Sequence, residues 1–304
     1  MSQTFNLQNF SARQSVSNTN AYTISIYNSY FSGISNSGLN GGALYLGGNL
    51  LLVMKMVFAI NCAANYGGFV YCASRWFNLT HCCGDRCIAN ELGQFGFLIP
   101  SGTSLNHFNM SSVQRSSPLM EGKHYPVAFR SSENIVHNFN SSNNILDKWG
   151  SGLNALGVSS VRVQYSTFSQ LYGRCVLLFR EISKSANVSF CNVVNNYIYP
   201  SEEYQGVVNF CLSMTISDCV FYNNTNNLFL CHEKSTNTVN VVRSYIESSP
   251  GSLVKLVDST IFPATSFQHY HVMNHNCGIR SDTTHNVKGN RNLLLFSLIN
   301  FIIL

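Results

Sequence analysis

One short phrase recurs along this chain at nearly constant spacing: an apolar residue, a polar residue and a second apolar residue. The seven clear copies are Ile24-Ser25-Ile26, Met54-Lys55-Met56, Phe77-Asn78-Leu79, Val161-Arg162-Val163, Val188-Ser189-Phe190, Met214-Thr215-Ile216 and Val239-Asn240-Val241. The second apolar residues are separated by 30, 23, 84, 27, 26 and 25 residues, and 84 is three steps of 28. A period near 26 residues is typical of a solenoid, in which each repeat forms one coil.

The phrase itself predicts a β-strand, because alternation of apolar and polar residues places one face in a core and the other in water. Three positions after each second apolar residue stands a small residue, as expected where a coil turns inward. These residues are Ser29, Ala59, Cys82, Ser166, Val193, Cys219 and Ser244. We therefore expect the two apolar positions and this small position to point into a common interior.

Each copy is followed by a second apolar run, usually entered through Gly or Asn, such as Gly41–Leu46 or Gly67–Tyr71. About 26 residues hold two or three short strands and their turns, but no helix of ordinary length. Strands stacked at about 4.8 Å pair in parallel with their copies above and below. The sequence predicts an all-β fold, a right-handed parallel β-helix of about nine or ten coils. A leucine-rich repeat and an antiparallel sandwich fit the pattern less well.

The pattern weakens between roughly residues 100 and 160, where Pro100, Pro118 and Pro126 interrupt it. Leu105-Asn106-His107 and Ile135-Val136-His137 are the expected weak copies, with loops or distorted coils around them. We expect an N-terminal segment or partial cap coil over residues 1–21 and a single β-helix domain over 22–275. A polar linker over 276–292 and a short hydrophobic tail over 293–304 complete the predicted organisation.

The eleven cysteines do not form a regular disulfide framework, since most lie within or beside the strand phrases, where a free Cys acts as a small apolar residue. His81, Cys82, Cys83 and Cys87 are the nearest approach to a metal-binding cluster. A second pair of ligands is missing, and adjacent cysteines on a strand face opposite ways. We therefore expect no metal or cofactor here; a local disulfide involving Cys87 is the alternative.

Composition bears on partners and location. Only 10% of residues are charged, and the net charge of +5 is scattered rather than arranged as a basic stripe, so nucleic-acid binding is not expected.

No secretory signal is visible at the N-terminus. The apolar stretch 293–304 is shorter than the about 20 residues of a spanning helix. We interpret this stretch as a truncated membrane anchor. The alternatives are a tail that packs on the last coil and a lipid-anchor signal that is removed.

Six Asn-x-Ser/Thr triplets are candidate glycosylation acceptors. They begin at Asn9, Asn78, Asn109, Asn140, Asn187 and Asn223. Alignment of the copies points Asn78 outward, away from the interior.

Catalysis on a polysaccharide needs two or three carboxylates close together. The chain has only five Asp, and no two of them align in neighbouring coils. Asp218 aligns instead with Arg243 one coil later, which predicts a salt bridge between coils. No catalytic residue is assigned.

Several tetrapeptides carry a resemblance to a known family. Gly41-Gly42-Ala43-Leu44 matches the GGA-[ILV] phrase of the chlamydial polymorphic outer membrane protein (Pmp) repeats, and Gly67-Gly68-Phe69-Val70 is a looser copy. The segments Phe58–Asn61 and Phe221–Asn224 match the FxxN phrase of these repeats. The chain, over roughly residues 22–260, thus resembles this family and related β-helix surface proteins of some protists. The family's pattern also includes a signal peptide and a C-terminal β-barrel translocator, and we expect neither from this sequence.

The resemblance implies a right-handed β-helix exposed at a cell surface or associated with a membrane, with adhesion as the usual role. We expect a non-catalytic adhesive or structural protein whose partner is a protein or glycan on another cell. The alternative is a β-helix enzyme acting on carbohydrate, a polysaccharide lyase or glycoside hydrolase, or a degenerate relative of one.

Overall fold

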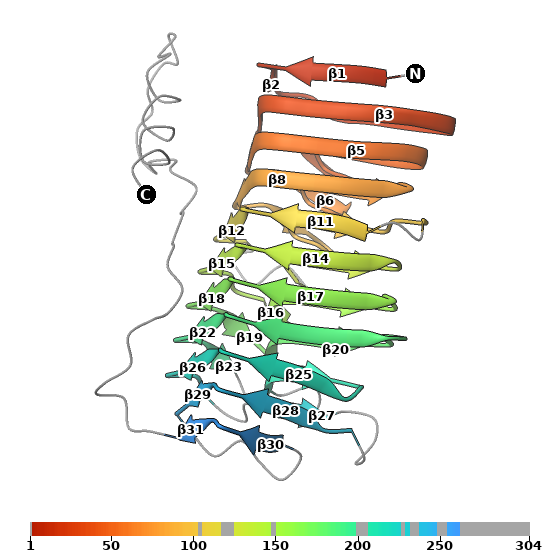
Figure 1. The fold of residues 1–304 in the computed structure, drawn as a ribbon. Coiled ribbons are helices and arrows are strands. Elements are labelled where there is room, and N and C mark those ends of the chain that lie inside the picture. The colour runs from red at the N-terminus through yellow and green to blue at the C-terminus, as the bar shows by residue number, and fades with distance from the viewer. Residues whose placement is uncertain are drawn as a thin grey trace, which may run out of the picture.

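The computed structural model describes residues 2–261, apart from 103–104, 117–124, 147–149, 199–205, 226–228, 232–236 and 248–253. Every regular element among these residues is a β-strand, and the strands pair in parallel as the chain winds through successive right-handed coils. Figure 1 shows the coils stacked from β1 at one end to β30 and β31 at the other. The predicted right-handed parallel β-helix is confirmed. The predicted linker 276–292 and tail 293–304 lie outside the described residues.

The coils have three walls. The first wall stacks β1 (Ser2–Asn6), β3 (Gln14–Ser32), β5 (Leu44–Ile60), β8 (Trp76–Asp85), β11 (Leu105–Asn109), β14 (Glu133–His137), β17 (Ser160–Gln164), β21 (Ser185–Ser189), β25 (Met214–Ser217), β28 (Val239–Val242) and β30 (Val254–Val257). The long strands β3, β5 and β8 continue round the corner into the second wall.

The second wall is completed by β2 (Asn9–Phe10), β12 (Ser112–Gln114), β15 (Asn140–Ser142), β18 (Thr167–Ser169), β22 (Asn192–Val194), β26 (Val220–Tyr222), β29 (Tyr245–Ile246) and β31 (Thr260–Ile261). The third wall holds β7 (Val70–Ala73), β10 (Gly96–Leu98), β13 (Val127–Arg130), β16 (Gly150–Leu156), β20 (Cys175–Arg180), β24 (Gly206–Phe210) and β27 (Phe229–Cys231). Two small sheets follow the second wall: β4 (Ser35–Asn40), β6 (Ala63–Tyr66) and β9 (Ile88–Ala89), then β19 (Tyr172–Gly173) and β23 (Tyr197–Ile198).

The described residues of the region 100–160 continue the stack. Strands β11 and β14 pair in register with each other and with their neighbours, as do β12 and β15 on the second wall. The register shift between Gly150 and Leu153, where β16 pairs with β20, is an irregularity of the kind expected. Strands β12 and β13 supply second and third walls that the sequence pattern did not reveal.

A line of phenylalanines fills much of the interior. Its members are Phe10, Phe31, Phe69, Phe95, Phe108, Phe139 and Phe168. Successive ring centroids are 4.4–6.3 Å apart, and all but Phe10 are fully buried. Each buried ring contributes about 1.5–3 kcal/mol by leaving water, and each aromatic pair about 0.5–1.5 kcal/mol more. This line ties one coil to the next through the core.

The pairing register corrects two of the predicted anchor positions by two residues. Ile26 pairs with Met54, not Met56, and Val188, not Phe190, stands between Val163 and Ile216. The buried anchors along the chain are Ile26, Met54, Leu79, Phe108, Val136, Val163, Val188, Ile216 and Val241. A shift by two preserves the alternation, so the sequence pattern did not distinguish the two registers.

The two weak copies exist but are shifted by one residue. Phe108 pairs with Val136, and both are fully buried, whereas Leu105 is 37% exposed and His107 and Ile135 are half-buried on the outside. A shift by one exchanges the inner and outer faces. The prediction took Leu105 and Ile135 as inward residues; they point outward because Asn106 and Asn134 occupy the inward positions.

The first corner, between the first and second walls, is made by one residue per coil with a left-handed backbone conformation. This column comprises Leu7, Asn28, Met56, His81, Met110, Asn138, Tyr165, Phe190, Asp218, Arg243 and Asp258, with φ between 44° and 57°. Asn, Asp and His adopt this conformation more readily than other non-Gly residues. Met56 and Phe190 are therefore corner residues, which explains why their apolar side chains lie outside the core.

The small column predicted after each anchor lines the inside of this corner. With the corrected anchors this inner corner column comprises Ser29, Val57, Cys82, Ser111, Phe139, Ser166, Cys191, Cys219, Ser244 and Ser259, all Ser or Cys except Val57 and Phe139. Five of the predicted members are correct. Ala59 and Val193 are wrong: they belong to another inward column, two residues further along.

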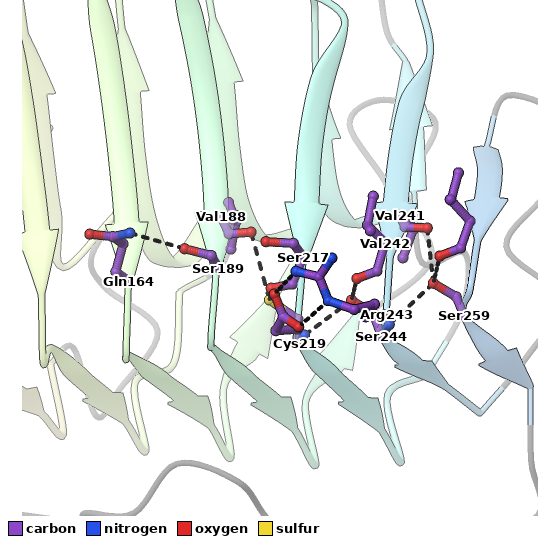
Figure 2. A network of polar contacts seen from close by, with 12 residues as sticks. Gln164, Val188, Ser189, Ser217, Cys219, Val241, Val242, Arg243, Ser244 and Ser259 are labelled. Carbon is purple, nitrogen blue, oxygen red and sulfur yellow. Dashed lines mark hydrogen bonds and ion pairs between the residues drawn. The ribbon is translucent and has the colours of Figure 1, made fainter.

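This inner corner column forms a hydrogen-bonded ladder in several coils (Figure 2). The Cys219 thiol donates to the carbonyl of Ser217 and accepts from the N–H of Cys191 at 3.4 Å. The Ser244 hydroxyl accepts from the N–H of Cys219, and the Ser259 hydroxyl from that of Ser244. Buried N–H groups at the bend are thereby satisfied without water.

Candidate interaction surface

The outward side chains of the first wall form a continuous surface, which we call the broad face. Leu51, Trp76 and Leu105 occupy one outward position in three successive coils, and Val53 and Ile135 occupy the next outward position nearby. All five are half-buried or exposed. Apolar side chains on the outside of a strand that already buries its other face form an exposed apolar patch, a common mark of an interaction site.

Trp76 is the largest side chain of this patch, and its position is fixed. The indole N–H donates to the backbone carbonyl of Leu105 on the next coil, with an N···O distance of 2.6 Å. This hydrogen bond restricts the rotamers of the half-buried indole already in the unbound protein. Aromatic anchors held rigidly contribute strongly to binding, because little conformational entropy remains to be lost.

Polar groups border the apolar patch. Asn78 lies beside Val53 on one coil and His107 on the next, and its side-chain oxygen accepts from the hydroxyl of Thr80 at 3.2 Å. On the far side of the patch, the ammonium of Lys184 is 2.8 Å from the carboxylate of Glu133. That hydrogen bond and the charge of Lys184 lower the pKa of Glu133. The pair is exposed, so it orients side chains more than it stabilises the fold.

The rest of the broad face is polar. The outward column that contains Val53 and Ile135 continues through Arg162, Asn187, Thr215, Asn240 and Lys255. The face thus changes from apolar and aromatic near β5, β8 and β11 to amide, hydroxyl and basic groups near β25, β28 and β30. An apolar core with a polar border is the ordinary anatomy of a protein interface.

A second aromatic cluster lies on the outside of the third wall. The rings of Tyr45 and Tyr71 are stacked with centroids 5.4 Å apart, and Phe97 follows Tyr71 at 5.7 Å. The guanidinium of Arg13 covers Tyr45, and that of Arg130 covers Phe97. Because the rings contact one another and the two Arg, they hold successive coils together. The repeat phrases did not reveal this cluster, although Tyr45 and Tyr71 are one repeat apart.

Several carboxylates are engaged by basic side chains. Arg243 forms two hydrogen bonds with Asp218, at 2.8 and 2.7 Å, so the predicted salt bridge between coils is confirmed. Arg115 likewise forms two hydrogen bonds with the fully buried carboxylate of Asp85, at 2.8 and 2.7 Å. Asp218 raises the pKa of Arg243 by its hydrogen bonds and its charge. Both carboxylates are thus engaged by the guanidinium group of a neighbouring coil.

The four residues nearest to a metal-binding pattern are dispersed by the corner. His81 is the left-handed corner residue, Cys82 points inward and is 1% exposed, and Cys87 is fully buried after the following turn. Burial raises the pKa of the Cys82 thiol to about 12, and that of the Cys87 thiol well above its ordinary value. Within the described ranges, no three His, Cys, Asp or Glu side chains form a metal-binding group.

The alternative of a local disulfide involving Cys87 is wrong, since Cys87 is a free thiol. Its Sγ contacts the carbonyl oxygens of Ala59 and Asp85 at 3.6 and 3.8 Å. Cys83 is the disulfide-bonded member of this cluster. Strand alternation explains the difference, because Cys83 points outward between two inward residues.

The six glycosylation candidates differ in exposure. Asn9 and Asn223 are exposed, and Asn78, Asn109 and Asn187 are half-buried. Asn140 is only 3% exposed, so its amide is the least accessible of the six in the folded chain. Asn78 points outward, as the sequence alignment predicted.

The glycine pairs of the repeat phrase have a clear structural role. Gly41-Gly42 and Gly67-Gly68 occupy equivalent positions, since Leu44 pairs with Val70. A Cβ atom on Gly42 would lie 2.1 Å from the carbonyl oxygen of Gly68, and both Ala43 and Phe69 beyond the pair are fully buried. Only glycine allows the backbones of successive coils to approach this closely.

The two FxxN copies are not equivalent. Phe221 is fully buried and aligns with Ala59 through the intervening coils, whereas Phe58 is half-buried on the outside. The Asn residues differ accordingly. Asn61 is a left-handed turn residue, and Asn224 donates from its amide to the carbonyl of Val193 at 2.7 Å.

No helix among the described strands and turns could cross a lipid bilayer, because none of sufficient length and apolarity is found there. Comparisons of the chain with models of protein families, with curated proteins and with solved structures found no match.

Proposed function

We propose that this chain is a non-catalytic β-helix protein of the cell surface that binds a protein or glycan on another cell through its broad face. The observation that carries the proposal is the rigid, half-buried Trp76 between Leu51 and Leu105, surrounded by amide, imidazole and charged groups. A patch of this composition suits the apolar face of a sugar ring or an apolar protein side chain.

The glycine pairs support the likeness to the Pmp-type surface repeats, because the two GG phrases occupy equivalent positions in successive coils. The ion-paired carboxylates support a binding role over hydrolysis, since Asp85 and Asp218 are held by arginines. An adhesive or structural role requires only a regular, stable outer surface, which the solenoid supplies through its repeated columns.

The test uses residues that the chain already places in the same outward column. Thr23 and Ser160 are column equivalents of Trp76 and Leu105, so Trp76→Thr and Leu105→Ser should preserve the fold. We expect the labelled full chain to bind intact animal cells, and the double variant to lose at least tenfold in apparent affinity. Prior treatment of the cells with glycosidases distinguishes a glycan from a protein partner.

Tyr197→Thr is the matched control, because Tyr197 is 46% exposed and lies on β23, away from the broad face. It should bind like the unaltered chain. Equal binding by the double variant would contradict the proposed surface. Release of new reducing ends from the bound glycans would contradict the non-catalytic assignment.

A further inference from the structure

The outward side chains of the left-handed corner column form a ridge along the edge of the broad face. We call it the corner ridge, and its members are Leu7, Asn28, Met56, His81, Met110, Asn138, Tyr165, Phe190, Asp218, Arg243 and Asp258. The backbone register aligns them one per coil. Lys55 pairs with Thr80 and Thr80 with Asn109, which places Met56, His81 and Met110 directly over one another.

Side chains in this ridge contact their column neighbours. The rings of Tyr165 and Phe190 are stacked with centroids 4.9 Å apart and an interplanar angle of 4°. One coil further on, Arg243 forms two hydrogen bonds with Asp218. A ridge position therefore brings its side chain within bonding distance of the next one in the column.

The segment Met56–His81–Met110 is the part of the ridge with soft donor atoms: two thioethers on either side of one imidazole. All three residues are half-buried. Thioether sulfur prefers Cu(I) among the biological metal ions, and imidazole is also a good copper ligand. The backbone of His81 lies about one strand spacing, roughly 4.8 Å, from that of Met56 and from that of Met110. Met side chains have three rotatable bonds, so both thioethers can bend toward the imidazole and reach one ion at metal–sulfur distances of about 2.3 Å.

We propose that Met56, His81 and Met110 bind one Cu(I) ion at the corner ridge. The imidazole of the middle coil supplies the nitrogen ligand, and the flexible thioethers above and below it converge on the same ion. All three ligands are uncharged, so the bound ion keeps its single positive charge, and no proton needs to leave a thioether. This set shares only His81 with the cysteine-containing pattern considered from the sequence.

Met at a left-handed position is unusual, because its side chain cannot form the local hydrogen bonds that favour Asn or Asp there. In this ridge Met stands on both sides of the single His, while Asn holds the equivalent position one coil further out on each side, at Asn28 and Asn138. The soft donors are thus confined to three successive coils.

The corner ridge itself supplies the variants. His81→Asn and Met110→Asn introduce the residue found at Asn28 and Asn138, and Met56→Leu introduces the residue found at Leu7. Each therefore places a side chain that this corner already accommodates. Met214→Leu is the control, since Met214 is an inward methionine that is 3% exposed.

The full chain, with accessible thiols alkylated in the native state, is titrated with Cu(I) under anaerobic conditions against a chromophoric Cu(I) chelator. We expect one Cu(I) per chain, at least tenfold weaker binding in each ridge variant, and unchanged binding in Met214→Leu. X-ray absorption on the loaded chain should show both sulfur and nitrogen ligands.

Two results would overturn the proposal. One is the absence of Cu(I) binding by the alkylated chain, or equal binding by the three ridge variants, which would assign any copper to residual thiols. The other is Zn(II) binding at the same residues with equal affinity, since a thioether-rich site should reject the harder ion. Circular dichroism of each variant confirms that the β-helix is intact.

Discussion

The hydroxyl of Ser244 accepts a hydrogen bond from the backbone N–H of Cys219 one coil earlier, at 3.0 Å, and donates to the carbonyl of Val242 at 2.8 Å. The same two bonds occur at Ser166, which accepts from Phe139 and donates to Gln164. One small side chain thus provides a hydrogen-bond partner for a backbone N–H of the preceding coil and for a backbone carbonyl of its own coil. The thiols of Cys191 and Cys219 take the same place in their coils.

This relationship predicts the effect of removing one hydroxyl. Ser244→Ala should lower the free energy of unfolding by about 1–3 kcal/mol, because the buried N–H of Cys219 loses its acceptor. Ser244→Cys should cost less, since cysteine occupies the column elsewhere. Urea unfolding measures both, and Ser185→Ala on the exposed outside of β21 is the control. Equal stability of the Ala variant and the unaltered chain would show that the ladder does not stabilise the fold.

The line of buried phenylalanines makes a second prediction. Phe108 touches Phe95, Phe129 and Phe139 and is fully buried. Phe108→Ala should therefore lower the free energy of unfolding by about 3–5 kcal/mol through lost burial and a residual cavity. Tyr197→Ala, an exposed aromatic, should change it by less than about 1 kcal/mol. A loss at Phe108 no larger than at Tyr197 would contradict the packed interior.

The close approach of coils at the glycine pairs makes a third prediction. Gly42→Ala places a methyl group 2.1 Å from the carbonyl oxygen of Gly68, so the coils must separate locally, and we expect a loss of about 1–3 kcal/mol or more. Gly38→Ala is the matched control, because no atom lies within 4 Å of the added carbon. Thermal unfolding of the two variants, side by side, distinguishes steric conflict from a general effect of removing glycine.

Buried thiols predict a loss of stability at alkaline pH. Burial raises the pKa of Cys72 from 9.0 to about 12. The folded chain keeps this thiol neutral while the unfolded chain ionises it, so its contribution is complete below pH 9 and decreases as the pH rises from 9 towards 12. Urea midpoints measured between pH 7 and 10.5 should fall, and the fall should be shallower in Cys72→Ala.

The same burial predicts that the Cys72 thiol reacts slowly with modifying reagents. Native chain at pH 8 should react with a thiol-specific disulfide reagent at a rate far below that of the urea-unfolded chain, since the thiolate is the reactive form. The Cys72→Ala variant identifies which signal belongs to this residue. Rapid modification of Cys72 in the native chain would contradict its burial.

The neighbours on the outer surface were predictable from the sequence only in part. Asp218 and Arg243 were paired correctly because the anchors of their own coils, Ile216 and Val241, were read in the correct register. Trp76 and Leu105 were not recognised as neighbours, because the second lies in a coil whose copy was read one residue out of phase. Met56 and His81 were likewise separated, since Met56 was assigned to a strand and His81 to a cysteine cluster.

The sequence alone determined the period, the alternation and hence the parallel β-helix, because every coil must bury the same face of its strands to form one core. Only the tertiary structure decided which residues of successive coils lie above one another. Corner residues in the left-handed conformation can be polar or apolar, so an apolar Met or Phe there extends the strand pattern by two positions without breaking its alternation. Only backbone pairing between coils removes that ambiguity, and the columns of the outer surface depend on it.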